Sequence, residues 1–201
     1  MKFLRLIAVH CMALFVLAGA ASASDISSTV GDRDCFGLGG SCPDGTRWQN
    51  QLGGVFFNNY QTPGDPAFTD KWSTDIAPTY VHNYVLDGIP TVADLLIKFA
   101  GVADFRGPWD VLFNGSLIGQ IPTNTSANGF QEVKSYVYSV PLNLLTGSDT
   151  VQLNINVPTQ TDGYSIDFSQ LEIVTSPVPE PGTILMLGSG LLGVAVLRRR
   201  R

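Results

Sequence analysis

The sequence predicts an all-β protein built around a single β-sandwich domain. The first observation is an alternation between residues 150 and 157, where Val151, Leu153 and Ile155 are separated by polar Gln and Asn side chains. A period of two is the pattern of a strand with one buried face. The second observation is Asn114-Gly115, a favoured hairpin turn, between two apolar-rich arms. The third is the repetition of such segments, roughly seven to nine strands without helical periodicity, which favours two packed sheets.

The strands are expected in a defined order along the chain. They are predicted at residues 79–86, 93–102, 109–121 (the hairpin), 133–140, 150–157 and 164–174. The segment 93–102 also has a helix-like composition, but Gly101 and the neighbouring strands leave little length for a helix. In the last strand the apolar side chains change parity between Phe168 and Leu171, which indicates a β-bulge near Ser169-Gln170.

The N-terminal segment, residues 1–23, is predicted to be a secretory signal peptide. Lys2 and Arg5 precede an apolar stretch that ends in small residues at positions 21–23. A basic start, an apolar centre and an A-x-A-like site are the layout of such a peptide. Cleavage is expected after Ala23, with Ala20 as the alternative.

The C-terminal segment is predicted to contain a transmembrane helix at residues 182–197, which carry no charge. At ~1.5 Å per residue this helix spans about 24 Å, less than the ~30 Å hydrocarbon core of a bilayer. Arginine side chains that reach toward the headgroups recover part of the difference. The cluster Arg198, Arg199, Arg200 and Arg201 is expected to stay on the cytoplasmic side as a membrane stop.

The sequence directly before that helix, Val178-Pro179-Glu180-Pro181, is not explained by a simple membrane anchor. Together with the glycine-rich helix and the terminal arginines, it resembles the PEP-CTERM sorting signal, at residues 177–201. The resemblance implies recognition by an exosortase, a membrane-embedded processing enzyme, and removal of the tail near the motif. It also implies a membrane-anchored precursor at the inner membrane, then delivery to the bacterial cell surface or to an exopolysaccharide matrix.

The middle of the chain, residues 24–176, is one domain with a strongly acidic composition. It holds sixteen acidic and six basic side chains, a net charge near −10. Nucleic-acid binding requires the opposite sign and is discounted. Cys35 and Cys42 are predicted to form a local disulfide, because exported proteins fold in an oxidising setting. The competing interpretation, a metal site, lacks neighbouring thiols and histidines.

The order of strands and turns from residue 79 to residue 175 resembles that of galactose-binding-like jelly-roll modules. The residues that carry this resemblance are FNGSLIGQIP, VYSVPLNLLTGSDTVQLNIN and TDGYSIDFSQLEI. The resemblance implies a jelly-roll-like sandwich. It does not by itself imply a function.

Candidate binding residues come from carboxylates and indoles. Asp162 and Asp167, near the closing strand, are candidate calcium ligands, because calcium prefers oxygen ligands from loops; the alternative for Asp162-Gly163 is a turn. Trp72 and Trp48 are candidate carbohydrate-stacking residues, and packing in the core is the alternative for both. No other cofactor is expected.

No catalytic residue is predicted. His82, the one histidine outside the signal peptide, lies in an alternating segment and is expected to be structural. The sequence therefore favours a non-catalytic surface or matrix protein that binds polysaccharide. The alternatives are an exported polysaccharide-active hydrolase and a membrane-tethered lectin whose tail is not processed.

Overall fold

Eight β-strands make up about half of the described residues in the computed structural model. The structure describes residues 24–37, 39–40, 42–46, 63–71, 73, 75, 77–100, 108–122, 132–155, 164–177 and 181–199. The strands are β1 (Asp25–Gly31), β2 (Thr79–Asn83), β3 (Ile89–Ala100), β4 (Trp109–Phe113), β5 (Ser116–Ile121), β6 (Lys134–Ser139), β7 (Ser148–Ile155) and β8 (Ser165–Ser176). A short 3₁₀-helix, η2 (Leu142–Leu144), precedes β7, and the helix α3 (Pro181–Arg199) follows β8.

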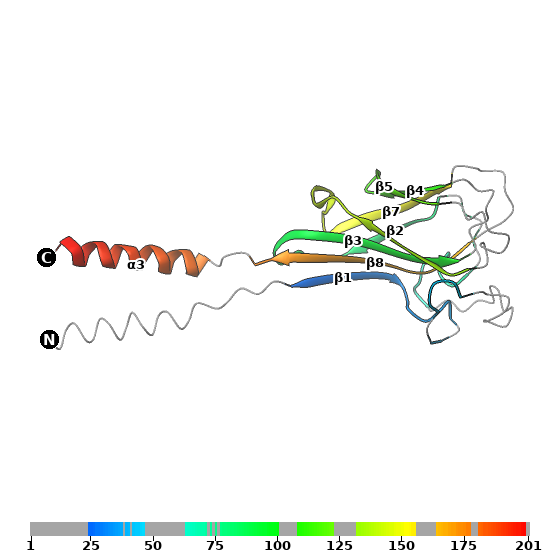
Figure 1. Ribbon diagram of the computed structural model, residues 1–201, viewed down its shortest axis with the longest axis horizontal. Helices are drawn as coiled ribbons and strands as arrows, with labels where there is room; N and C mark the ends of the chain where they lie inside the picture. The colour runs from blue at the N-terminus through cyan, green and yellow to red at the C-terminus, as the bar shows by residue number, and fades with distance from the viewer. Residues whose placement is uncertain are drawn as a thin grey trace. The chain divides into compact units, whose positions relative to one another are not determined.

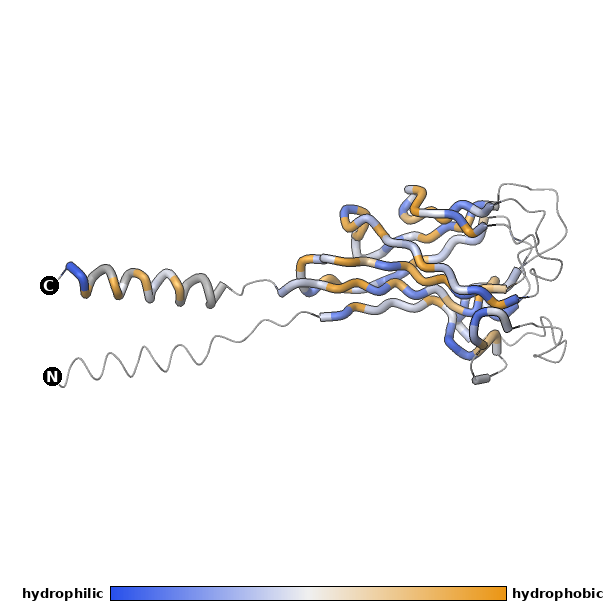
Figure 2. The backbone as a smooth tube through the Cα atoms, viewed as in Figure 1, coloured by the Kyte–Doolittle hydropathy of each residue, from blue (hydrophilic) through white to orange (hydrophobic). Residues whose placement is uncertain are grey.

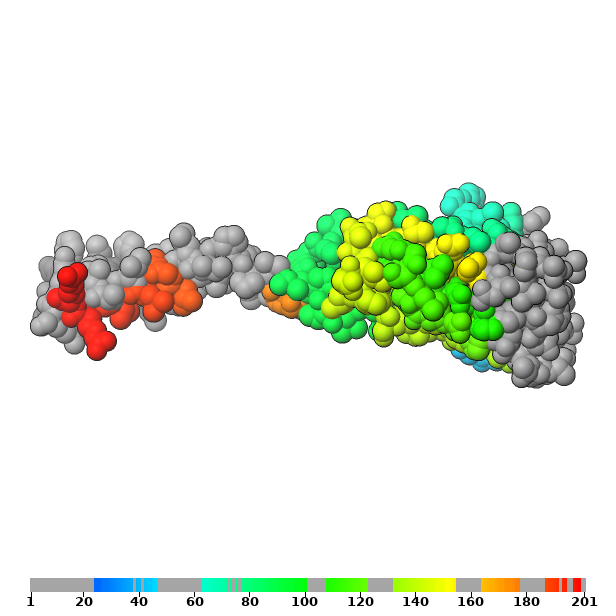
Figure 3. Space-filling model, turned by 90° about the horizontal axis from the view of Figure 1, so that it is seen from above, coloured from blue at the N-terminus to red at the C-terminus, as the bar shows by residue number. Residues whose placement is uncertain are grey.

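The strands form two four-stranded sheets, which confirms the predicted β-sandwich. One sheet has the order β1-β8-β3-β6 and the other β2-β7-β4-β5 (Figure 1). The hairpin β4–β5 turns at Asn114-Gly115, as predicted, and both residues have the positive φ that such turns require. Figure 3 shows this hairpin, in green, beside the yellow surface that contains β7, its hydrogen-bonded neighbour. The strand β1 had no counterpart among the predicted segments.

The core lies between the sheets and follows the alternation of the strands. Apolar and polar residues succeed one another along most strands (Figure 2). In β4 and β7 the buried apolar residues are Trp109, Val111, Phe113, Val151 and Leu153. The Trp109 ring meets the ring of Tyr164, which precedes β8, edge to face at 4.7 Å. Burial of these large side chains supplies the main stabilisation of the sandwich.

The first part of β8 differs from the other strands because its residues are buried on both faces. Positions 165 to 171 are all buried, whereas Glu172 and Val174 are exposed. Its pairing with β1 runs without a shift from Gly31 opposite Phe168 to Asp25 opposite Val174. The bulge predicted near Ser169-Gln170 is therefore absent from this pairing, and the mixed parity reflects a central strand covered on both sides.

The helix α3 belongs to a different compact unit of the chain from the sandwich. It covers residues 182–197, where the sequence predicts a helix, and its last turn carries Arg198 and Arg199. Within the described residues, no helix combines the length and the apolar character needed to cross a membrane. The transmembrane role of this segment stays a prediction.

A polar contact between the two sheets lies within the core. His82 on β2 is 0% exposed, and its ring nitrogens lie 3.3 Å from the Ser28 hydroxyl on β1 and 3.1 Å from the Ser169 hydroxyl on β8. Burial lowers the His82 pKa to about 4, and Ser28 and Asp149 offset this only in part. The histidine is thus a neutral, hydrogen-bonded part of the core.

We expect this histidine to make the folding stability depend on pH. Unfolded His82 takes up a proton below its usual pKa of 6.5, whereas the folded protein does so only near 4. Stability is therefore lost as the pH falls from 6.5 to 4, by on the order of 3 kcal/mol. Urea unfolding across this range, for the protein and for His82→Gln, isolates the effect as a difference in slope. Parallel curves would show that His82 does not titrate in this way.

Candidate functional site

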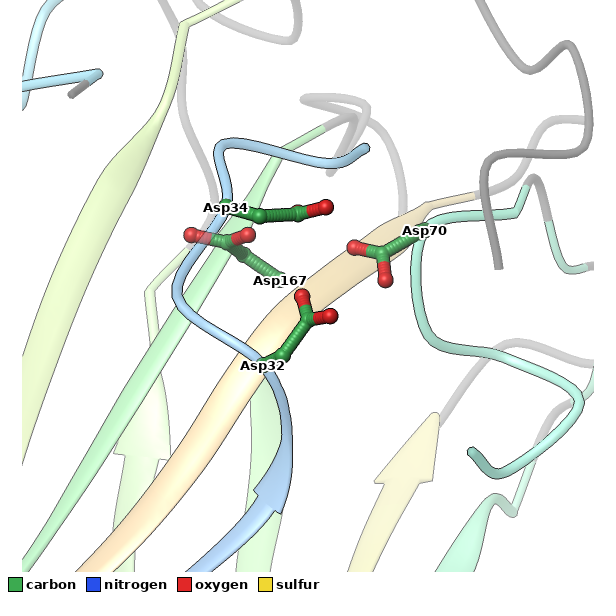
Figure 4. A group of neighbouring side chains, drawn as sticks. All are labelled: Asp32, Asp34, Asp70 and Asp167. Carbon is green, nitrogen blue, oxygen red and sulfur yellow. The ribbon is translucent and has the colours of Figure 1, made fainter. Parts of the chain in front are cut away.

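Four aspartates from three separate parts of the chain meet at one end of β8. Asp32 and Asp34 follow β1, Asp70 lies in the segment 63–71, and Asp167 lies on β8 (Figure 4). One carboxylate oxygen of each residue lies within 4.8 Å of one from every other. We call these four residues the aspartate cluster.

The end of β1 approaches β8 closely because residue 31 is a glycine. Gly31 has a φ of +78°, and a Cβ at this position would lie 2.5 Å from the Asp167 carbonyl oxygen and 3.1 Å from Thr69 Cγ2. A side chain here would force the three segments apart. The glycine therefore allows Asp32, one residue further on, to lie beside Asp167.

Asp70 is held in place by backbone hydrogen bonds to the start of β8. Its N–H donates to the Ile166 carbonyl at 2.9 Å, and the Ile166 N–H donates to the Phe68 carbonyl at 3.2 Å. Asp70 has a φ of +54°, an uncommon conformation for a residue with a side chain. The backbone thus fixes the Asp70 side chain in a position that is only 2% exposed.

The disulfide loop covers the other side of the cluster. Cys35 and Cys42 form the predicted disulfide, and the N–H of Phe36 donates to Asp167 Oδ1 at 2.8 Å. The N–H of Gly37 donates to Asp34 Oδ1 at 2.6 Å. These two backbone donors bind one oxygen of Asp167 and one oxygen of Asp34.

The cluster concentrates negative charge in a place with little water. Burial, together with the charges of Asp34, Asp167 and Asp32, raises the pKa of Asp70 to about 8. Burial likewise raises the pKa of Asp167 to about 6 against the effect of the Phe36 N–H, and it raises the pKa of Asp34. Within the described residues, neither carboxylate oxygen of Asp70 has a hydrogen-bond partner. A buried acceptor without a donor is costly, so this carboxylate is suited to a cation.

The arrangement offers carboxylate oxygens alone, the kind of ligand that calcium prefers. Calcium takes oxygen ligands at about 2.3–2.6 Å, so two oxygens on opposite sides of it are about 5 Å apart. That separation agrees with the 4.8 Å limit on the spread of the cluster. The ligand set contains no thiolate or imidazole, which zinc and copper prefer. Asp32, Asp34, Asp70 and Asp167 can therefore hold a divalent cation such as calcium.

The structure finds one of the two calcium ligands expected from the sequence in this cluster. Asp167 is part of it, whereas Asp162 lies outside the described residues. Asp32, Asp34 and Asp70 were not expected. The Asp32-Arg33-Asp34 spacing was a usable signal for two of them, but it lacks the third acidic position and the glycine of a complete calcium loop. No local signal marks Asp70, which reaches the cluster through pairing with β8.

The other predicted site residues lie mostly beyond the described part of the chain. This holds for Trp72, Trp48 and three residues of the sorting motif, Val178, Pro179 and Glu180. It also holds for Arg200 and Arg201. Pro181 is the first residue of α3.

The fold and the aspartate cluster define a class of protein, a β-sandwich with a candidate cation site. The C-terminal segment adds a more specific assignment: residues 177–201 match the PEP-CTERM protein-sorting motif. The chain carries this motif, as its sequence predicts. No curated protein sequence matches the chain.

Several solved structures are similar to the chain. Dimeric latent PorU from Porphyromonas gingivalis is 14% identical with a TM-score of 0.47; the match covers 79% of this chain and 14% of PorU. The module CBM35 from Cellvibrio japonicus Abf62 is 12% identical with a TM-score of 0.38, covering 75% of this chain and 92% of the module. A CBM36 module in complex with calcium and xylotriose is 14% identical with a TM-score of 0.33, covering 47% and 71%. All three TM-scores are under 0.5, so the sandwich assignment rests on the chain's own sheets.

We expect opposite effects of one substitution with and without calcium. In EDTA at neutral pH, Asp70→Asn should raise the melting temperature. Unfolded Asp70 is ionised at this pH, whereas burial beside three other carboxylates raises its pKa to about 8, so folding must protonate it at a cost that Asn avoids. In calcium at about a hundred times its dissociation constant, the unchanged protein should gain roughly 2.7 kcal/mol, and Asp70→Asn should gain much less.

Asp75→Asn is the matched control, since Asp75 is exposed and outside the cluster. It should keep the full calcium response in the same melting experiment. An Asp70→Asn protein with an undiminished calcium response would remove Asp70 from the site.

Proposed function

We propose that this chain is an exported, non-catalytic protein of the cell surface or extracellular matrix that binds polysaccharide. The observation that carries the proposal is the PEP-CTERM sorting motif at residues 177–201. In this proposal the signal peptide directs export, an exosortase-type enzyme at the inner membrane removes the tail, and the sandwich is the lasting product.

The chemistry of the described residues supports binding over catalysis. His82, the histidine of the sandwich, is fully buried and engaged by two serines, so a substrate cannot reach it. The aspartate cluster supplies oxygen ligands for a cation. The cysteines beside it form a disulfide, so they offer no free thiol as a nucleophile. A cation in this position joins the loop after β1 to β8 and the segment 63–71, which makes a stable platform for a ligand.

Polysaccharide is the ligand class that the proposed location offers. Trp72 and Trp48 are the candidate stacking residues, because an indole presents a flat apolar face to the C–H side of a sugar ring. The segment 63–71 that ends just before Trp72 supplies Asp70 to the aspartate cluster. A bound cation would therefore restrict the chain next to this tryptophan.

Processing of the tail is the first test. Intact-protein mass spectrometry should show that the mature protein lacks about twenty residues that follow the Pro-Glu-Pro triplet, including Arg198 to Arg201. Glu180→Ala should block this loss, because the Pro-Glu-Pro triplet is the proposed recognition element. Ser176→Ala, directly outside the matched segment, is the control and should be processed normally. Surface protein that still carries its arginines would support the unprocessed lectin instead.

Polysaccharide binding is the second test. A glycan array with the full-length protein in calcium should give signals on polysaccharides. Trp72→Ala should weaken the binding free energy by about 1–2 kcal/mol, the contribution of one lost aromatic contact. Equal signals from both proteins would exclude Trp72 from the site. Release of reducing sugar from the bound polysaccharides would contradict the non-catalytic assignment.

A further inference from the structure

A small pocket adjoins the aspartate cluster and is lined by groups of the opposite charge. Its volume is about 250 Å³, and Arg33, Lys98, Asp167, Phe168 and the Cys35–Cys42 disulfide line it. Pockets for drug-sized ligands are larger, at roughly 300–1,000 Å³. This pocket therefore suits one small unit, of the size of a single sugar ring.

Two of the six basic side chains of residues 24–176 lie in this one pocket. The domain has a net charge near −10, so two basic side chains in one pocket make a local concentration of positive charge. The guanidinium carbon Cζ of Arg33 lies over the Phe168 ring, 4.7 Å from its centroid, and this cation–π contact holds the guanidinium against the ring. No salt bridge joins Arg33 to a carboxylate within the described residues. The donors of this guanidinium thus remain available to a ligand.

Among the described residues, the ammonium group of Lys98 has no close salt bridge, although its charge also acts on Asp167, which lines the same pocket. Its side chain is 15% exposed, and its Nζ lies 3.9 Å from Asp44 Oδ1. The same carboxylate accepts hydrogen bonds from the Ser135 N–H at 2.9 Å and the Ser135 hydroxyl at 2.7 Å, so it is already occupied. A largely buried ammonium group with such a distant partner favours an anionic ligand.

The charge of the neighbouring carboxylates opposes the binding of an anion in the pocket. Asp167 belongs to both the pocket and the aspartate cluster, so an anion in the pocket faces the negative charge of the cluster. A divalent cation in the cluster cancels part of this charge and leaves the two basic side chains dominant. The cation and the anion should therefore bind cooperatively.

We infer that this pocket binds an anionic sugar residue of a polysaccharide, through Arg33 and Lys98, when a divalent cation occupies the aspartate cluster. The inference rests on the proposed polysaccharide-binding function and names its ligand class. A planar carboxylate or a sulfate group can accept two parallel hydrogen bonds from the guanidinium of Arg33. The disulfide and the Phe168 ring form the apolar walls beside the sugar ring.

Matched pairs of charged and neutral polymers test this inference with the full-length protein in calcium. Polygalacturonate should bind at least tenfold more tightly than its methyl-esterified form, which has the same backbone without the charge. Dextran sulfate and dextran form a second pair, which distinguishes a sulfated from a carboxylated source. Removal of calcium with EDTA should weaken binding of the charged polymer.

Substitutions assign the effect to the pocket. Arg33→Gln and Lys98→Gln should each weaken binding of the charged polymer by about 10- to 100-fold, the effect of losing one charged hydrogen-bonding group. Lys134→Gln is the control, because Lys134 also lies 3.9 Å from a carboxylate, that of Glu132, but does not line the pocket. An unchanged calcium-induced shift of the melting temperature shows that each variant is folded.

The outcomes separate the two proposals. Equal binding of charged and neutral polymers, or equal affinity of Arg33→Gln and the unchanged protein, would overturn the anionic-sugar inference and leave the proposed function standing. If neither the charged nor the neutral polymers bind, and a wider glycan panel gives no signal, the proposed polysaccharide binding falls and the inference falls with it.

Discussion

Burial of β8 on both faces is the constraint on which the rest of the structure depends. A polar side chain on the buried part of such a strand loses its contact with water, so a hydrogen-bond partner from another element stabilises it. Ser169 meets His82 of the opposite sheet, Gln170 donates to the Ser27 hydroxyl, and Asp167 accepts the Phe36 N–H. These contacts attach β2, β1 and the disulfide loop to one strand. The core and the aspartate cluster thus depend on the same element.

The fold was predictable from the sequence wherever one face of a strand is exposed. The alternation in 150–157 and the Asn114-Gly115 turn identified β7 and the β4–β5 hairpin correctly. Two features escaped. The strand β1 is mostly polar, so its identity comes from pairing with β8 rather than from its own pattern. The bulge predicted in β8 is absent from its pairing with β1, because alternation carries no register information where both faces are buried.

The candidate site was less predictable because three distant segments build it. Asp167 could be singled out from the sequence, and Asp32 with Asp34 forms a recognisable but incomplete spacing. Nothing near Asp70 signals a ligand, since its position results from backbone pairing with Ile166. The pocket beside the cluster could not be predicted from the sequence either, because Arg33 and Lys98 are 65 positions apart. They line one pocket because β1 and β3 are both neighbours of β8 in the same sheet. Local sequence patterns therefore predict the strands, whereas a site built from distant segments can be predicted only when the order of the strands in the sheet is known.

The Cys35–Cys42 disulfide links the structure of the pocket to the proposed export route. Thiols remain reduced in the cytoplasm and oxidise outside it, so the loop that carries the Phe36 donor and one wall of the pocket is covalently closed only after translocation. In the proposed route, a newly made chain would cross the membrane before this loop is closed. Closure of the proposed anion pocket would then coincide with arrival in the compartment where charged glycans occur.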